Sequence, residues 1–310
     1  MPELPEVTTT VKGLQKVLPR LIFIDVWTDL NKKNQKIKQF KDTIKNDVFF
    51  KSFKNKIIGQ KVINVERRAK NILINIKGGY TILIHLKMTG HLLYGKYVFN
   101  KKENKWSPDT KEKKSLFDPY NKYIHVVFTL SNGKHLAFCD SRKFGKVTII
   151  SIANLDTTPH LKNIGPEPLE KTFTFLKFKN QLLLKPNWNI KTVLMNQSII
   201  AGIGNIYSDE MLWLVGIHPE SKPKNIPNTL LMSLYKGMKE VLNKGINFGG
   251  DSMSDYRNID GLPGNFQNHH NVYKKKNTKC VKKNCRGVIM RKVINGRSAH
   301  FCSIHQKLFN

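Results

Sequence analysis

The first six residues bring together groups that could carry out covalent chemistry. The chain opens MPELPEV, which places Pro2 next to Glu3 and four residues before Glu6, in the first turn of a predicted helix. Removal of Met1 would leave Pro2 with a secondary amine, and α-amino groups have pKa values of about 7.7–8.0, so a useful fraction is unprotonated at neutral pH. Such an amine can attack a sugar or carbonyl carbon and form an iminium ion directly. Glu3 is the adjacent candidate for acid–base help, and Glu6 could orient the terminus.

A structural interpretation of the same stretch is simpler. Prolines are common in the first turn of a helix, so Pro2 and Pro5 could merely start one. Taken alone, the motif favours this interpretation, although we expect that a helix start would not need both carboxylates. The remaining constellations decide between the two.

The last 31 residues contain a candidate metal site. Two tight pairs, Cys-x4-Cys and Cys-x2-His, flank a segment with an Asn295-Gly296 turn signal, which predicts a β-hairpin with Arg297 at its tip. Two such pairs can supply the four tetrahedral ligands of a structural zinc ion, which would hold Arg297 rigidly. The alternatives are three unpaired thiols beside an unrelated histidine, or His300 as a rival ligand. The candidate ligands are Cys280, Cys285, Cys302 and His305.

Two strand ends carry apolar residues beside cations. Met88 lies in HLKMTG, and Phe144 follows Arg142 and Lys143 in DSRKFG. Core packing is the usual role of a Met or Phe. Neighbouring cations favour a second role, insertion of an apolar wedge into a stack of bases.

A third motif, AGIGN, precedes a predicted helix. We expect Asn205 to cap that helix, whose free N–H groups and dipole would favour an anion such as a DNA phosphate. Taken alone, a glycine-containing helix start is more often a plain turn.

The composition indicates a polyanionic partner. The chain has 310 residues with 53 Lys+Arg against 22 Asp+Glu, a formal net charge of +31. Such a field attracts nucleic acid and speeds the encounter, with an anionic membrane surface as the alternative. No apolar run approaches the roughly 18–20 residues of a membrane span, and no signal peptide precedes the start. We therefore expect a cytoplasmic, nucleoid-associated protein without disulfides, and Cys139 as a core residue.

The hydrophobic pattern predicts an α+β protein. Residues 6–18 have helical periodicity, and paired β-rich runs meet at Gly78-Gly79 and at Asn132-Gly133. We expect one helix and an antiparallel β sandwich in residues 1–155, with residues 96–114 as an exposed loop. A hinge at 156–171 precedes a helical domain at 172–273, with helices over 192–200, 206–216 and 228–246. Residues 251–268 are predicted to be a mobile loop, and 274–310 the zinc-binding unit.

Together these motifs resemble the formamidopyrimidine-DNA glycosylase family, bacterial repair enzymes for oxidised purines. The resemblance extends over nearly the whole chain, through MPELPEV, RRAK at 67–70, HLKMTG, RKFG, GPEPL at 165–169, AGIGNIYSDE and the cysteine unit. It implies an N-terminal β sandwich, a helix–two-turn–helix domain and a zinc finger. The implied partner is damaged double-stranded DNA bound by a monomer, with one structural zinc ion as the only cofactor.

The resemblance also implies residue roles. Pro2 would attack C1′ of the damaged nucleotide with Glu3 as acid–base partner, and Lys70 and Arg297 would assist β- and δ-elimination. Met88, Arg142 and Phe144 would fill the hole left by the everted nucleotide, and the loop 251–268 would cover the flipped base. The remaining implied DNA-contacting residues are Glu6, His85, Tyr123, Lys143, Lys185, Lys191, Asn205 and Tyr256.

The chain departs from the family pattern at four places. Cys-x4-Cys replaces the usual Cys-x2-Cys, and His305 replaces a cysteine. Lys143 stands where arginine is usual, which weakens a forked phosphate contact. Tyr123 stands where a DNA-contacting histidine is common, with His125 two residues on.

Three other functions fit parts of the pattern. A related branch of endonuclease VIII type excises oxidised pyrimidines and typically has glycine where this chain has Leu4. A non-enzymatic, zinc-stabilised DNA-binding protein would need no nucleophile. A tautomerase with an amino-terminal proline would need neither the charge nor the zinc hairpin.

Overall fold

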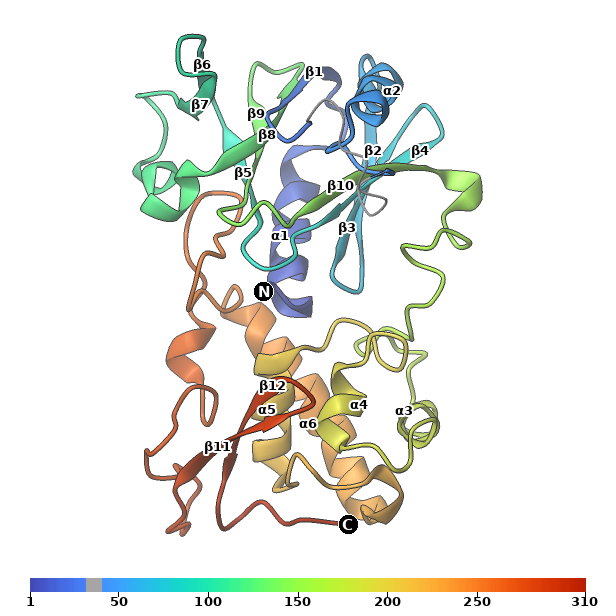
Figure 1. Ribbon diagram of the computed structural model, residues 1–310, viewed down its shortest axis with the longest axis vertical. Helices are drawn as coiled ribbons and strands as arrows, with labels where there is room; N and C mark the ends of the chain where they lie inside the picture. Colours follow the sequence, from blue (N-terminus) through green and yellow to red (C-terminus); the bar gives the residue numbers. More distant parts are fainter. Residues whose placement is uncertain (32–40) are drawn as a thin grey trace. The chain divides into compact units, whose positions relative to one another are not determined.

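The computed structural model describes residues 1–31 and 41–310 of the chain. The described residues form two compact units (Figure 1). The first comprises residues 1–162 and 248–265, and the second comprises residues 163–247 and 266–310. Within the described residues, no helix combines the length and the apolar character that crossing a bilayer requires.

The first unit begins with helix α1, Leu4–Val17, which starts two residues before the predicted range. Its apolar side chains recur at helical spacing, so Val7, Val11 and Leu14 all lie on one buried face. These three residues join the main hydrophobic core together with strand residues. Core packing therefore fixes the orientation of the helix that begins two residues after Pro2, the candidate nucleophile.

Two four-stranded antiparallel sheets form the rest of the sandwich, as predicted. One has the order β1-β8-β9-β5 and the other β10-β4-β3-β2. The predicted glycine turns are present, since Gly79 and Gly133 adopt positive φ angles of 76° and 74° that suit glycine. The strands are β1 Phe23–Thr28, β2 Val62–Arg68, β3 Asn71–Ile76, β4 Tyr80–His85, β5 His91–Gly95, β8 Ile124–Leu130, β9 His135–Cys139 and β10 Lys146–Ser151. Cys139 is fully buried, as expected.

The prediction of an exposed loop at residues 96–114 was wrong. Strands β6, Tyr97–Asn100, and β7, Lys105–Pro108, form a hairpin in this segment. Phe99 and Trp106 pack on Trp27, with ring centroids 5.7 Å and 6.4 Å away. The abundance of lysine hid these aromatic residues, which cover the outer face of β1 and β8. Helix α2, Asp47–Ile57, was also not predicted and begins at the Asn46 cap.

The second unit contains four α-helices and a β-hairpin among its described residues. The helix predicted at 192–200 instead spans Ile190–Met195, and residues 196–200 form tight turns. Hairpin β11–β12 packs beside helix α5 (Figure 1). The elements are α3 Phe175–Leu183, α4 Ile190–Met195, α5 Asn205–Val215, α6 Asn228–Asn247, β11 Ile289–Ile294 and β12 Arg297–Cys302. Short 3₁₀ helices occur at Lys114–Phe117, Pro119–Lys122, Ile152–Asn154, Pro223–Asn225 and Phe266–His269.

Residues 248–265 belong to the first unit, although we had expected them in the helical domain. The hydroxyl of Tyr256 donates to the backbone oxygen of Glu6 at 3.0 Å. Ser252 Oγ donates to the carbonyl of Tyr256 at 2.7 Å and accepts from the backbone N–H of Gly264 at 2.8 Å. The segment is thus a loop of irregular structure whose base is tied to helix α1.

Candidate active site and nucleic-acid interface

The carboxylate of Glu6 organises the amino end of the chain. One oxygen accepts the backbone N–H of Glu3 at 2.7 Å, and the other accepts that of Asp251 at 2.7 Å. Glu3 and Glu6 also form a reciprocal capping box around the start of α1. The expectation that a helix start would not use both carboxylates was therefore wrong. The same pair nevertheless positions the backbone next to Pro2 and links it to the loop at 251.

Pro2 is buried, whereas Met1 is 39% exposed. Glu3 is 2% exposed and Glu6 is 1% exposed, so both carboxylates lie in a largely dehydrated environment. Electrostatic interactions are stronger there than in bulk water. An amine generated by removal of Met1 would therefore adjoin, in the sequence, a buried carboxylate at Glu3 whose backbone N–H is held by Glu6.

Strand register places two further candidate residues, Lys70 and His85, at the same edge of the second sheet, β10-β4-β3-β2. Asn71 pairs with His85 across β3 and β4, and Lys146 pairs with the same histidine across β4 and β10. Lys70 directly precedes this row and is 5% exposed. It lies in a tight turn where Ala69 has a φ of 53°, an unusual conformation for a residue with a side chain. Lys70 and His85 thus lie near each other at this edge of the sheet.

His85 is neutral in this environment. Burial, followed by the nearby charges of Lys87 and Lys70, lowers the pKa of His85 to about 3. Its Nδ1 accepts the backbone N–H of Lys87 at 3.0 Å, so the proton resides on Nε2. A neutral imidazole that carries its proton on Nε2 can donate that proton in a hydrogen bond to a phosphate oxygen.

Two loops flank this edge of the sheet. The Met88 loop, residues 86–90, follows β4, and the Phe144 loop, residues 140–145, precedes β10. Phe144 is 51% exposed, and the guanidinium carbon of Arg142 lies 4.5 Å from its ring centroid. Met88 is partly buried, whereas Arg142 and Lys143 are exposed. An exposed Phe stacked by a cation is the arrangement expected of a wedge rather than of a core residue.

Tyr123 and His125 differ in accessibility. Tyr123 is 39% exposed, with Lys122 Nζ 5.2 Å from its ring centroid. His125 is 7% exposed, and its Nδ1 lies 2.9 Å from the carboxylate of Asp29. The geometry therefore favours Tyr123 as the surface residue at this position.

In the second unit, Asn205 does not cap helix α5. The N-cap is Gly204, and Asn205 is the first helical residue, so that prediction was wrong. The Oδ1 atom of Asn205 is buried, and it has no hydrogen-bond partner among the residues that the structure describes. Gln197 braces the preceding turn by donating to the carbonyl of Ile203 at 2.8 Å and accepting from Gly202 at 2.9 Å. The helix N-terminus remains a suitable anion site.

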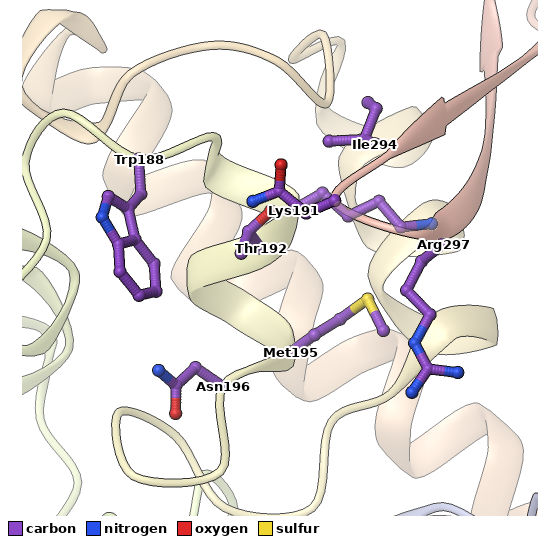
Figure 2. A pocket seen from close by; sticks show the side chains of 8 residues that line it. Trp188, Lys191, Thr192, Met195, Asn196, Ile294 and Arg297 are labelled. Atoms are coloured by element: carbon purple, nitrogen blue, oxygen red, sulfur yellow. The ribbon is translucent and has the colours of Figure 1, made fainter.

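Arg297 lies directly after the Asn295-Gly296 turn, as predicted, and its side chain is exposed. It shares a pocket of about 280 Å³ with residues of α4 and the preceding loop, including Trp188 and Lys191 (Figure 2). Lys185 lies outside the pocket lining, exposed, with its Nζ 4.9 Å from the Trp188 ring centroid. Cationic and aromatic groups thus gather around the hairpin tip.

Lys191 is 1% exposed and has structural partners. Its ammonium donates to the carboxylate of Asp209 and, at 2.9 Å, to the carbonyl of Ser298 in β12. The second oxygen of Asp209 accepts the backbone N–H of His300 at 2.9 Å and lies 3.0 Å from its Nδ1. Lys191 and Asp209 therefore clamp the Arg297 strand to α4 and α5. Sequence inspection missed Asp209, and the only available signal was its place in the AGIGNIYSDE motif.

The four candidate ligands meet in the second unit. Their donor atoms all lie within 4.8 Å of one another, with 3.4 Å between Cys280 Sγ and His305 Nδ1 and 3.5 Å between Cys285 Sγ and Cys302 Sγ. Tetrahedral zinc, with Zn–S near 2.3 Å and Zn–N near 2.0 Å, requires separations of about 3.5–3.8 Å. The donor set therefore fits zinc. His300 is not part of it, because it bonds Asp209.

Outer contacts orient these ligands. His305 Nε2 lies 2.9 Å from the carbonyl of Trp213, so Nε2 carries the proton and Nδ1 is left to bind a metal. The indole N–H of Trp213 donates to Cys280 Sγ at 3.4 Å, and the backbone N–H of Gly287 donates to Cys285 Sγ at 3.3 Å. Such donors stabilise thiolates. The longer first pair and the terminal histidine are thus compatible with the site.

Comparison with known proteins gives a consistent result. The model of the formamidopyrimidine-DNA glycosylase N-terminal domain matches residues 1–147, and that of the H2TH domain matches residues 164–257. A formamidopyrimidine-DNA glycosylase of Pelotomaculum thermopropionicum is 34% identical over 99% of this chain and 100% of its own length. One of Bacillus subtilis is 32% identical over 98% of each chain.

Solved structures agree with this result. A complex of the Lactococcus lactis Fpg with DNA containing an abasic site has a TM-score of 0.79 and 28% identity, over 98% of this chain and 99% of that one. A complex of the wild-type L. lactis protein with DNA containing N7-benzyl-Fapy-dG has a TM-score of 0.80 and 28% identity, over 99% and 100%. The chain therefore belongs to the formamidopyrimidine-DNA glycosylase family of DNA repair enzymes.

Proposed function

We propose that this protein is a bifunctional DNA glycosylase and AP lyase that excises oxidised purines, among them 8-oxoguanine and formamidopyrimidines. The nitrogen of Pro2, exposed by removal of Met1, bonds to C1′ of the damaged nucleotide as the base departs. The C1′–O4′ bond of the sugar then opens, with O4′ taking up a proton, and this leaves a Schiff base that makes the 2′ proton acidic, so β-elimination and then δ-elimination cleave the strand.

The contact of Glu6 with both Glu3 and Asp251 carries this proposal. It holds the chain terminus at 2.7 Å on one side and the base of the loop 251–268 at 2.7 Å on the other. Glu3, adjacent to the nucleophile, exchanges protons with the sugar and the leaving base. Lys70 assists β-elimination, and Arg297 binds the phosphates around the lesion and assists δ-elimination.

The base must leave the helix before the amine can reach C1′. Everting a nucleotide costs a few kcal/mol of stacking and pairing. Insertion of Met88 and Phe144 offsets part of that cost, and Arg142 pairs with the orphaned base. The loop around Tyr256 covers the everted base. Phosphate contacts come from His85, Tyr123, Lys143, Lys185 and Asn205, in a chain whose net charge is +31.

The zinc ion acts structurally. Cys280, Cys285, Cys302 and His305 would fill its coordination sphere, so it holds the base of hairpin β11–β12 and leaves the chemistry to protein side chains. We further propose that the protein acts as a monomer in the cytoplasm, associated with the nucleoid. The proposed functional division is a catalytic sandwich at 1–155, a hinge at 156–171, a DNA-binding helical domain from 172 to 273 and a zinc finger at 274–310, with residues 248–265 packed in the first unit instead of the helical domain.

Two matched assays test the proposal. An amino-terminal tag that blocks removal of Met1 should abolish base excision on an 8-oxoguanine duplex while binding to DNA persists. Normal excision by the tagged protein would exclude Pro2 as nucleophile. Rates on thymine glycol duplexes, measured in parallel, should be slower than on 8-oxoguanine; faster cleavage of thymine glycol would assign the enzyme to the endonuclease VIII type.

A further inference from the structure

A buried carboxylate joins the Met88 loop to the Phe144 loop. Asp140 is fully buried at the end of β9. One of its oxygens accepts the hydroxyl of Thr89, and the other accepts the backbone N–H of Gly145 at 2.6 Å. The Thr89 hydroxyl in turn accepts the backbone N–H of Arg142 at 3.2 Å. Hydrogen bonds therefore run from the residue next to Met88 to both ends of the loop that carries Arg142 and Phe144.

The two loops also share one packing surface. An added Cβ at Gly90, in the first loop, would lie 2.9 Å from the ring of Phe138. A Cβ at Gly145, in the second loop, would collide with the same ring. Both backbones thus approach one buried side chain from β9, which leaves little room for either loop to shift without the other.

A buried lysine holds the second loop from another direction. Lys45 is 8% exposed, and its ammonium donates to the carbonyl of Lys143 at 2.6 Å. Lys143 has a φ of 56°, a conformation that residues with side chains adopt only when their surroundings enforce it. Lys45 and Asp140 together therefore keep the loop in a strained shape that presents Phe144 to solvent.

We propose that Asp140 and Thr89 are positioning residues that couple the two loops, so that Met88 enters DNA in concert with Arg142 and Phe144, and that Lys45 braces this unit. The proposal rests on the wedge role assigned under the proposed function. If the two loops are coupled, their side chains enter the space left by the everted nucleotide in one step. Independent loops would have to insert one after the other, each against the full stacking energy.

Stopped-flow fluorescence tests the coupling without chemistry. The full-length, zinc-loaded protein is mixed with a duplex containing a tetrahydrofuran abasic analogue and a neighbouring 2-aminopurine that brightens when unstacked. Thr89→Val should slow the fluorescence rise roughly tenfold, the effect expected from losing a hydrogen bond to a charged group. Thr89→Ser, which keeps the hydroxyl, should restore the wild-type rate. Thr81→Val is the matched control, because that buried hydroxyl donates to Asn75 at 2.6 Å, away from both loops.

Double variants distinguish the coupling between the two loops from the insertion of Met88 and Phe144 into DNA. Met88→Ala and Phe144→Ala should together slow insertion about as much as either alone, because the loops act as one unit. In the Thr89→Val background their effects should multiply instead. If both single variants are slow but Thr89→Val is as fast as wild type, the coupling is excluded and the wedge role survives. If both wedge variants insert at the wild-type rate, the wedge role fails and the coupling fails with it.

Lys45→Met gives an independent arm that leaves Thr89 intact. Insertion should slow severalfold, while the slope of log Kd against log salt stays at the wild-type value because the buried ammonium contacts no phosphate. A slope reduced by about one would identify Lys45 as a phosphate contact and exclude the bracing role. Wild-type insertion by Lys45→Met would exclude that role as well.

Discussion

The buried pair of Lys191 and Asp209 leads to a prediction that separates two interpretations of Lys191. The resemblance implies a lysine that contacts DNA near the lesion. In the structure, its side chain is 1% exposed, and its ammonium is bonded to Asp209 and to the backbone of β12. Among the described residues, replacing Lys191 by Met would leave the fully buried Asp209 carboxylate with its two contacts to His300.

Removing one partner of a buried ion pair typically costs about 3–5 kcal/mol, because the remaining charge stays dehydrated. The two contacts from His300 compensate in part, so we expect a loss near the lower figure. At roughly 2–4 °C per kcal/mol, the melting temperature of the second unit should fall by about 10 °C. Asp209→Asn in the same background should recover part of the loss, since no buried charge then remains.

Differential scanning calorimetry measures the first effect, and titration with a tetrahydrofuran duplex well below the melting temperature measures DNA affinity. We expect destabilisation with the salt dependence of binding unchanged. An unchanged melting temperature together with weaker binding and a smaller salt slope would refute the structural role and restore Lys191 as a DNA contact.

Three further predictions concern the hairpin, the metal and one histidine. Arg297→Ala should reduce strand cleavage strongly while leaving the melting temperature within about 1 °C, because the side chain is exposed at a turn tip; a large fall in melting temperature would indicate a structural role instead. A strong chelator should lower cleavage and thermal stability together as zinc is released to a chromophoric indicator, whereas unchanged stability with no zinc released would exclude a structural ion. Burial lowers the pKa of His85 from 6.5 to about 3. At pH values between these two figures, the His85 side chain is therefore neutral in the folded protein and protonated in the unfolded chain. Stability should therefore be full above about pH 6.5 and decline as the pH falls toward 3. His85→Gln should reduce that decline in urea titrations, with a residual slope from His91, whose pKa burial lowers to about 4; an identical pH dependence in the variant would contradict the assignment.

The sequence predicts the parts of the site that lie at turns. Arg297 follows an Asn-Gly turn, and Met88 and Phe144 follow or precede strands with clear hydrophobic patterns, so local signals were sufficient to place them. The four metal ligands were likewise recognisable from two short spacings. In each case the information lies within a few neighbouring residues.

The features that the sequence did not predict depend on contacts between segments that are far apart in the chain. Thr89 and Asp140 are 51 residues apart, and Asp209 and His300 are 91 residues apart, so no local periodicity connects them. The hairpin at 97–108 was hidden because three lysines separate its aromatic residues in the sequence, and those residues pack only once β1 and β8 are in place. Asn205 was misassigned as a cap because Gly204, without a side chain to bond the helix, occupies that position.

The central claim is that the amine of Pro2 forms the covalent bond to the sugar. Mass spectrometry of the purified protein after borohydride reduction with an 8-oxoguanine duplex tests this claim most directly. We predict a protein without Met1 whose DNA adduct maps, after proteolysis, to the nitrogen of Pro2. An adduct on a lysine such as Lys70, or an active sample that retains Met1, would contradict the account.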